Sequence, residues 1–380
     1  MTSKLLDICF LVTDKMSVTE LKNYNAYIST ENMLPYKGGI TTPASIPSDG
    51  KITAYKKNDV LVSNIRPYFK KIWFALNDGG CSNDVLVFRA KSGVSPDYLH
   101  YILSDDAFFD YAMKTSKGTK MPRGDKKAIM EFEIADMDLC KQQKAAIILH
   151  LIDQRIAVNT AINENLEQQA QAIFCNRFPN CMSNGIAMSN IIDVRDGTHD
   201  SPKAKEKGYY LITSKHLQAY SVNKIGANLI SYEDFKKINE RSKVEYGDIL
   251  ISMIGTVGLI SFISDEKIDF AIKNVGLFRT SQNLKLRFYL LNYLKSNEVI
   301  NYIEQHLAGS TQKYISLTEL RNLPIHIPSD ENLQDYNTLV SPIYGTIMDL
   351  YQENQRLANL RDTLLPKLMN GEIDVSQVKI

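Results

Sequence analysis

The sequence is poor in several features that mark common protein classes. Its five cysteines form no CxxC pair and have no histidine at a zinc-ligand spacing, so we expect reduced thiols and no metal site. Basic residues barely outnumber acidic ones, 44 to 43, which argues against a nonspecific coat for nucleic acid. No run approaches the roughly 20 apolar residues of a membrane span, and the N-terminus lacks a signal-peptide cleavage pattern. We therefore predict a cytoplasmic protein without a membrane partner.

Motifs for catalysis are missing as well. The sequence has no Walker motif, HExxH, GxSxG, nuclease carboxylate cluster or Asn-Pro-Pro-aromatic motif of a methyltransferase. The segment MIGTVG (253–258) has the glycines of a phosphate loop, but it lacks the Gly-Lys-Ser/Thr ending and the helix that must follow. A turn between two strands explains it better. We expect no catalytic residue, no metal and no cofactor bound by this chain.

What the sequence does contain is an internal repeat with a period of about 190 residues. NDVLVS (58–63) matches GDILIS (247–252), and DVLVFRA (84–90) matches NVGLFRT (274–280). Gly118 matches Gly309 at an offset of 191. Because the matches keep their order, the chain is a duplicated unit rather than a solenoid.

Each copy mixes strand and helix patterns, which predicts an α+β fold. Short runs typical of strands are LVSNI (61–65) and KIWFAL (71–76), and 248–254 with 257–263 has the pattern of a hairpin. Apolar residues then recur at helical spacing over 96–114 and 287–307.

A long helix is predicted at the end of each copy. Residues 141–174 contain neither proline nor glycine, and about 34 residues at 1.5 Å each span about 50 Å. The apolar stripe has heptad-like spacing, which favours pairing of the two helices in an antiparallel coiled coil; the alternative is that each helix packs on its own globular domain. The residues assigned to pairing and partner contact are Ile152, Ile156, Asn163, Leu166, Ile343, Ile347, Asn354 and Leu357.

Two polar residues occupy equivalent positions on or beside this stripe. Asn163 and Asn354 would fix the register of the helices if they are buried as a pair, and would be neutral if solvated. The second helix is expected to stop at Asn370-Gly371, a good C-terminal cap.

The order of these segments resembles the specificity subunits of type I restriction–modification systems over nearly the whole chain. The segments that carry the resemblance are YISTENM (27–33), GTKMPRGDKKAIMEFEI (118–134), INENLEQQAQAIF (162–174), DGTHDSP (196–202), GSTQKYISLTELRNLPIHIP (309–328) and LANLRDTLLPKLMNGEIDV (357–375). One departure is the end of the first domain, IADMD (134–138), where the second has IPSDE (327–331) with the usual proline.

The resemblance implies a domain organisation and a set of partners. Target-recognition domains would occupy 1–138 and 179–328, with a central spacer helix in 139–178 and a C-terminal spacer helix and tail in 329–380. The chain would bind double-stranded DNA at a bipartite, asymmetric site, and would dock two modification subunits with adenine-N6 methyltransferase activity as well as restriction subunits. S-adenosylmethionine, ATP and Mg²⁺ would belong to those partners.

Four segments have the lysines, arginines and small polar residues that DNA contact requires. They are SNIRPYFKK (63–71), KTSKGTKMPRGDKK (114–127), VRDGTHDSPKAK (194–205) and GSTQKY (309–314), and the second and fourth occupy equivalent positions. The candidate DNA-binding residues are Arg66, Lys70, Lys71, Lys117, Lys120, Arg123, Lys126, Arg195, Thr198, His199, Lys203, Lys215, Thr311, Gln312, Lys313 and Tyr314. For Thr198 and His199, a turn held by aspartate side chains explains the sequence equally well.

Two alternatives to a working specificity subunit stay open at this point. The first is a silent, recombining copy of such a subunit. A DNA-binding coiled-coil adaptor of another pathway would show the same helices and basic loops.

Overall fold

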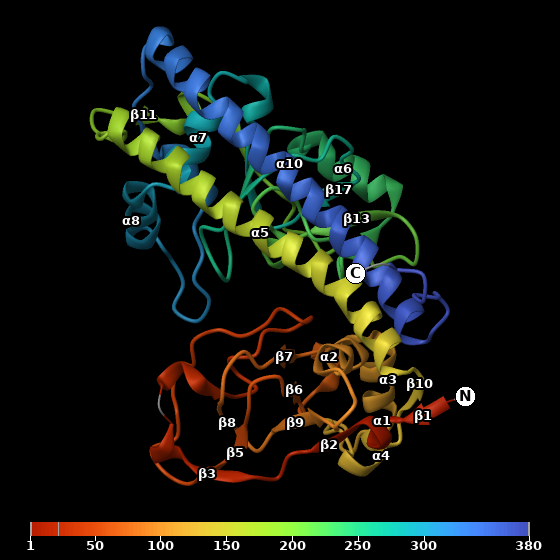
Figure 1. Cartoon of the computed structure of the whole chain (residues 1–380). Helices are drawn as coiled ribbons and strands as arrows, with labels where there is room; N and C mark the ends of the chain where they lie inside the picture. Colours follow the sequence, from red (N-terminus) through yellow and green to blue (C-terminus); the bar gives the residue numbers. More distant parts are fainter. Residues whose placement is uncertain (1, 22, 379–380) are drawn as a thin grey trace. The chain divides into compact units, whose positions relative to one another are not determined.

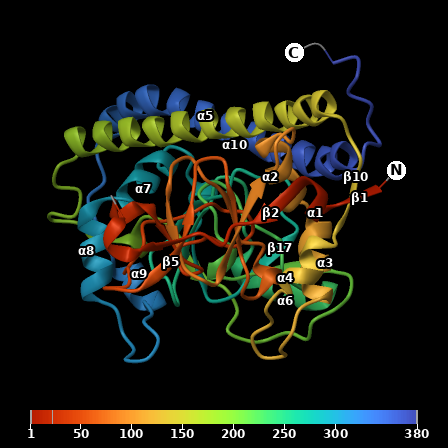
Figure 2. The ribbon, with the colours of Figure 1, turned by 60° about the horizontal axis from the view of Figure 1, so that its bottom comes forward.

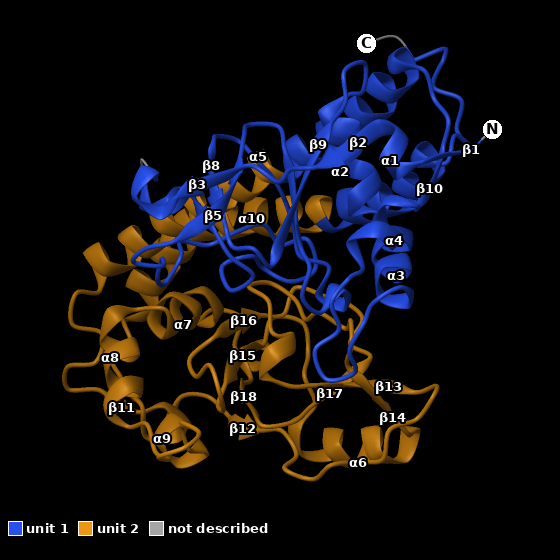
Figure 3. Cartoon of the chain, turned by 90° about the horizontal axis from the view of Figure 1, so that it is seen from below, with its two compact units in different colours: residues 1–156, 355–380 blue, residues 157–354 orange. Residues whose placement is uncertain are grey.

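The computed structural model describes residues 2–21 and 23–378 and divides the chain into two compact units (Figure 3). Unit 1 comprises 1–156 and 355–380, and unit 2 comprises 157–354. Each unit contains one globular domain and one segment of each long helix, α5 (Leu139–Arg177) and α10 (Asp330–Met369) (Figure 1).

The domain of unit 1 is built on a four-stranded antiparallel sheet in the order β2-β9-β6-β7, which we call the first-domain sheet. A second sheet has the order β3-β5-β8-β4, and β1 pairs with β10. The bounds are β1 (Thr2–Lys4), α1 (Leu5–Ile8), β2 (Cys9–Leu11), β3 (Lys15–Ser17), β4 (Tyr27–Ile28), β5 (Lys51–Tyr55), β6 (Val60–Ser63), β7 (Ile72–Phe74), β8 (Gly79–Cys81), β9 (Val85–Ala90), α2 (Pro96–Ser104), α3 (Asp106–Lys114), α4 (Lys126–Met130) and β10 (Glu133–Ala135).

The domain of unit 2 repeats this plan. Its second-domain sheet has the order β12-β18-β15-β16, a smaller sheet has the order β14-β13-β17, and β11 pairs with β19. The bounds are β11 (Ile186–Ala187), β12 (Val194–Asp196), β13 (Tyr209–Ile212), β14 (Asn228–Ile230), α6 (Tyr232–Ser242), β15 (Ile249–Ser252), β16 (Ile260–Phe262), β17 (Phe270–Ile272), β18 (Val275–Phe278), α7 (Arg287–Leu294), α8 (Asn297–Gln305), α9 (Leu317–Asn322) and β19 (Pro324–Ile325).

The predicted repeat is confirmed by this shared topology and by the backbone. Gly118 and Gly309 both adopt left-handed conformations, with φ of 91° and 90°. The predicted hairpin at 248–263 is present as β15 and β16, which are antiparallel. Since β16 rather than a helix follows MIGTVG, this segment is the expected turn.

The helical segments 96–114 and 287–307 are each broken in two, which differs from the single helical stretch suggested by the sequence. Asp105 is extended, with ψ of 141°, and its side chain accepts a hydrogen bond from the amide of Ala107 at the start of α3. Ser296 does the same for α8 by accepting from Val299. A capping side chain thus starts a new helix inside each apolar pattern.

The long helices pack together in both units, as predicted. In unit 1, Leu149 of α5 shares a core with Leu365 of α10, and Asp153 pairs with Arg361 at 3.0 Å. In unit 2, Leu166 packs on the core that holds Ile347. Because early residues of α5 meet late residues of α10 and the reverse, the helices are antiparallel, as Figure 2 shows. Each helix segment also packs on its own domain, so the two alternatives are both realised.

The assigned pairing residues differ in burial. Ile347 is fully buried, whereas Ile152, Ile156, Leu166, Ile343 and Leu357 are half-buried. Asn163 is buried and donates to the carbonyl of Ile347 at 3.2 Å, while Asn354 accepts from Asn159 at 3.0 Å. The polar contact at this level is therefore made by Asn159, which the sequence did not single out.

The expectation that no segment is apolar enough for a membrane span needs correction. An 18-residue window of α5 reaches a mean hydropathy of 1.3, which suffices by length and composition alone, and 22% of this window is buried. Helices in the core of a protein pass the same test, and α5 packs on α10 and buries Asn159 and Asn163. Its composition is therefore weak evidence for a span.

Candidate DNA-binding surface

In the first domain, two of the predicted loops meet at one end of the first-domain sheet. The loop after Ser63, the last residue of β6, is joined to the 117–125 loop by backbone hydrogen bonds. The amide of Arg66 donates to the carbonyl of Pro122 at 2.8 Å, and the amide of Gly124 donates to that of Asn64 at 3.2 Å. The sheet thus presents the loops SNIRPYFKK and KTSKGTKMPRGDKK as one surface.

The three cations of the first loop have different surroundings. Arg66 is exposed, and no described carboxylate lies within ion-pair distance of it. Lys70 pairs with Asp106 at 2.9 Å. Lys71 is half-buried and donates to the carbonyl of Thr30 at 2.6 Å, and burial lowers its pKa. Of the three, Arg66 is the most available to a ligand.

The basic residues of the second loop also differ in whether they have an acidic partner. Lys117 pairs with Asp125 at 2.6 Å, and Arg123 pairs with Asp84 at 3.3 Å. Lys120 and Lys126 are exposed, and neither has an ion pair among residues 2–21 and 23–378. Asp125 also caps α4 by accepting from the amide of Lys127, so this acidic residue serves the loop's own structure.

The second domain brings the equivalent loops together in the same way. Residues 252–258 join 308–315, since Gly255 donates to the Lys313 carbonyl at 3.3 Å and Ile315 donates to that of Met253 at 3.0 Å. The predicted contact residues in this loop, Thr311, Gln312, Lys313 and Tyr314, are all exposed. The two domains therefore offer the same backbone arrangement with different side chains.

The loop DGTHDSP begins where β12 ends, at the same end of the second-domain sheet. Asp196 pairs with Gly276 of β18, and Ser252 at the end of β15 pairs with the adjacent Val275. Thr198 forms a bridge with Lys273. Lys215 is exposed and follows β13, whose last residue accepts a hydrogen bond from the amide of Lys273, so it lies near this loop.

A buried carboxylate holds this loop in place. Asp196 is 3% exposed and pairs with Arg241 of α6 and with His199, whose Nε2 lies 3.0 Å away. The other ring nitrogen of His199 contacts Asn274 at 2.8 Å. The loop is thus ordered by its aspartate, and His199 still exposes 65% of its side chain. Sequence reasoning missed Arg241, because α6 lies far from the loop in the chain.

Two further candidates lie apart from these contacts. Arg195 directs its guanidinium to Asp193, at 2.7 Å, toward the start of β12 and away from the loop end. Lys203 is exposed just beyond the loop. Both residues stay candidates for DNA contact.

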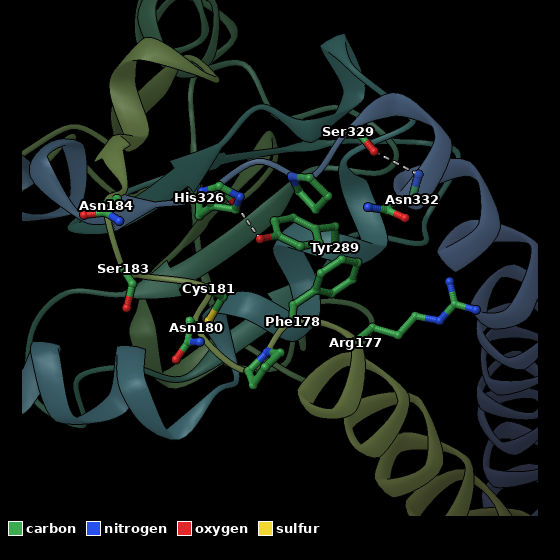
Figure 4. A pocket seen from close by; sticks show the side chains of 12 residues that line it. Arg177, Phe178, Asn180, Cys181, Ser183, Asn184, Tyr289, His326, Ser329 and Asn332 are labelled. Carbon is green, nitrogen blue, oxygen red and sulfur yellow. Dashed lines mark hydrogen bonds between the residues drawn. The ribbon is translucent and has the colours of Figure 1, made fainter.

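A cavity of about 540 Å³ lies where α5 ends in unit 2, and aromatic rings form part of its wall, unlike the basic loops described above (Figure 4). Its wall includes Phe178 and Tyr289, whose hydroxyl donates to the carbonyl of His326. Phe178 and Tyr289 pack edge to face with centroids 5.1 Å apart, and both contact Tyr336 of α10. These rings join the helices to the domain. Among the described residues, no group of three or more possible metal ligands occurs, here or elsewhere.

Known proteins decide the family. The sequence profile of the type I restriction modification DNA specificity domain matches residues 1–168 and 191–351. The chain belongs to the family of type I restriction–modification specificity subunits. As such it is the DNA-recognition component of its system and is not itself an enzyme.

Individual relatives of this specificity subunit agree. It is 24% identical over 321 residues to the MjaIX specificity subunit of Methanocaldococcus jannaschii, which covers 76% of this chain and 71% of that one. It is 23% identical to the HindI specificity subunit of Haemophilus influenzae over 453 aligned positions, covering 92% and 96%. The crystal structure of an S subunit from M. genitalium matches with a TM-score of 0.55, at 14% identity, over 97% and 96% of the two chains. That structural match supports the fold.

Proposed function

We propose that the two domains of this specificity subunit each bind one half of a split, asymmetric double-stranded DNA site. The observation that carries the proposal is the pair of joined loops at the same sheet end in each domain. Backbone hydrogen bonds keep the loops alike, while MPR (121–123) stands in one and QKY (312–314) in the other. Different side chains on one scaffold favour different half-sites, because base edges are recognised by side-chain donors and acceptors.

We further propose that two modification subunits, which methylate adenine at N6, dock on the long helices, and that restriction subunits join them. Two observations support this. The start of each helix forms a groove against its own domain, lined by Gln143 and Ile147 in one unit and by the repeat-equivalent Gln334 and Thr338 in the other. In addition, α5 exposes Leu151, Val158 and Ile162, at 59%, 52% and 40%. Exposed apolar side chains along a helix are typical of a protein interface.

In this assembly the specificity subunit places the modification subunits and does no chemistry. The methyltransferase must take its adenine out of the base stack, and the two domains decide at which adenines that occurs. S-adenosylmethionine, ATP and Mg²⁺ belong to the partner subunits. The five free thiols agree with a cytoplasmic location, which we also propose.

The test is co-expression with the modification subunit of the same system, followed by methylation-sensitive sequencing of the host genome. We expect a stable complex and adenine methylation at one split motif, lost when this chain is deleted. A stable complex that methylates no motif would mean a silent copy. Failure to form any complex, with DNA binding retained, would mean an adaptor of another pathway.

A further inference from the structure

Five described residues of the first domain are left-handed although they are not glycine, and three of these lie just before β6 or in the loop after it. Arg66, Lys70 and Asn58 have φ of 50°, 49° and 71°. At the corresponding places in the second domain stand Gly255, Gly258 and Gly247, with φ of 81°, 90° and 87°. Asparagine tolerates this conformation, whereas arginine and lysine adopt it at a cost in stability. Glycine occupies the corresponding left-handed positions of the second domain, where the loop between the two strands is one residue shorter (253–259 against 64–71), so a reason is needed for the side chains at 66 and 70.

For Lys70 the reason is inside the protein. Its ammonium group and that of Lys37 both pair with Asp106 of α3, at 2.9 Å and 2.8 Å. These two ion pairs attach the turn to α3. The left-handed backbone at Lys70 is therefore matched by a structural contact.

Arg66 has no such contact. In residues 2–21 and 23–378 its guanidinium has neither an acidic partner nor a hydrogen-bond acceptor, and the side chain is exposed. Its backbone, by contrast, is held firmly: the amide donates to Pro122, and the carbonyl accepts from Phe69 at 3.0 Å. A strained backbone thus carries an exposed guanidinium that has no partner among the described residues.

We propose that Arg66 is a specificity-determining residue that binds the edge of a guanine in the half-site of the first domain. This inference rests on the proposed DNA-binding role of the joined loops. A guanidinium matches the O6 and N7 acceptors of guanine in the major groove. A phosphate contact needs only a flexible cation, which Lys120 and Lys126 supply without strain. Readout of a base needs a direction, and a rigid, left-handed turn supplies one.

The experiment compares Arg66→Gly with the matched variant Asn58→Gly, which lies before β6 and outside the joined loops, in the complete complex with the modification subunits. Both substitutions place glycine at a left-handed position, so neither should lower the melting temperature through backbone strain. With Arg66→Gly we expect adenine methylation at the native site to fall about tenfold or more, as for loss of one bidentate base contact. One guanine position in one half of the split motif should become tolerant of other bases. Asn58→Gly should leave the motif unchanged.

Two more variants separate a base contact from other roles. Arg66→Lys keeps the charge but not the planar fork of donors, so we expect a smaller loss of guanine preference than with Arg66→Gly. A neutral variant that weakens binding of all sequences equally, with unchanged preference at every motif position, would identify a phosphate contact and overturn the proposal. Arg66→Asn tolerates the left-handed backbone and replaces Arg66→Gly if that variant fails to fold. An unaltered motif with either neutral variant would also refute the role of Arg66. A wild-type complex that methylates no split motif would instead refute the proposed function.

Discussion

The salt dependence of DNA binding follows from the two exposed, unpaired lysines of the 117–127 loop. We predict that replacing Lys120 and Lys126 by glutamine weakens binding and makes it less sensitive to salt. Lys120 lies in the loop joined to the Arg66 turn and Lys126 begins α4 directly after it. Neither has a carboxylate partner in the described chain that would share its charge. Adding Arg123→Gln should have a smaller effect than either lysine, because Arg123 already pairs with Asp84 at 3.3 Å.

The magnitude follows from counterion release. Each phosphate contact contributes about 0.9 to the slope of log K against log salt, so loss of two contacts should flatten the slope by about 1.8. Over a fourfold rise in salt, the wild-type complex should then lose about tenfold more affinity than the variant. The loss of the two charges should be felt on all sequences, specific and nonspecific, since phosphates carry no base identity.

The assay is DNA binding by the assembled complex at several salt concentrations. A matched control is Lys56→Gln with Lys57→Gln, two exposed lysines before β6, at the opposite end of the first-domain sheet. The control should keep the wild-type slope. An unchanged slope in the Lys120 and Lys126 variant, or an equal change in the control, would refute the placement of DNA at this loop.

Three other outcomes are expected. Burial lowers the pKa of His100 to about 4, so this ring is neutral in the fold and takes up a proton on unfolding below its usual pKa of 6.5. The free energy of unfolding should therefore fall by up to about 3 kcal/mol as the pH drops from about 6.5 to 4. His100→Gln should remove this component from the pH dependence of thermal unfolding. The fully buried Asn159 donates hydrogen bonds to Glu353 and Asn354 at 2.9 and 3.0 Å. Asn159→Ala should therefore lower the free energy of unfolding, measured by chemical denaturation, by about 2 kcal/mol. A loss below about 0.5 kcal/mol would contradict its role between the helices. Arg241→Ala should remove the guanidinium that pairs with the buried Asp196 and leave the contact with His199. The loss should loosen the DGTHDSP loop and lower methylation of the motif, and unchanged methylation would argue against DNA contact by this loop.

The large-scale organisation could be predicted because the repeat is visible as short matching segments of the sequence. The offset between NDVLVS and GDILIS predicted that β6 and β15 are equivalent strands, and the turn at Gly255 and Gly258 followed from it. The absence of proline and glycine from 141–174 predicted α5 to within a few residues. The cap at Gly371, with φ of 75°, was equally local.

Contacts between distant segments could not be predicted in this way. Lys71 was one of several equivalent lysines in the sequence, and only the fold brings it against Thr30. The ion pair of Arg195 with Asp193 could not be predicted from composition either. The arrangement that orders DGTHDSP depends on Arg241, 45 residues from Asp196 in the chain. Charge and loop composition identify candidates, whereas tertiary packing decides which of them stay available.

The most direct test of the central account is the adenine methylation pattern of the host genome, with this chain present and deleted and the modification subunit kept in both. The account predicts one split, asymmetric motif that is methylated with the chain and unmethylated without it. If the complex forms in the cells that have the chain, and both genomes still carry the same methylated motifs, the conclusion that these two domains choose the site would be contradicted.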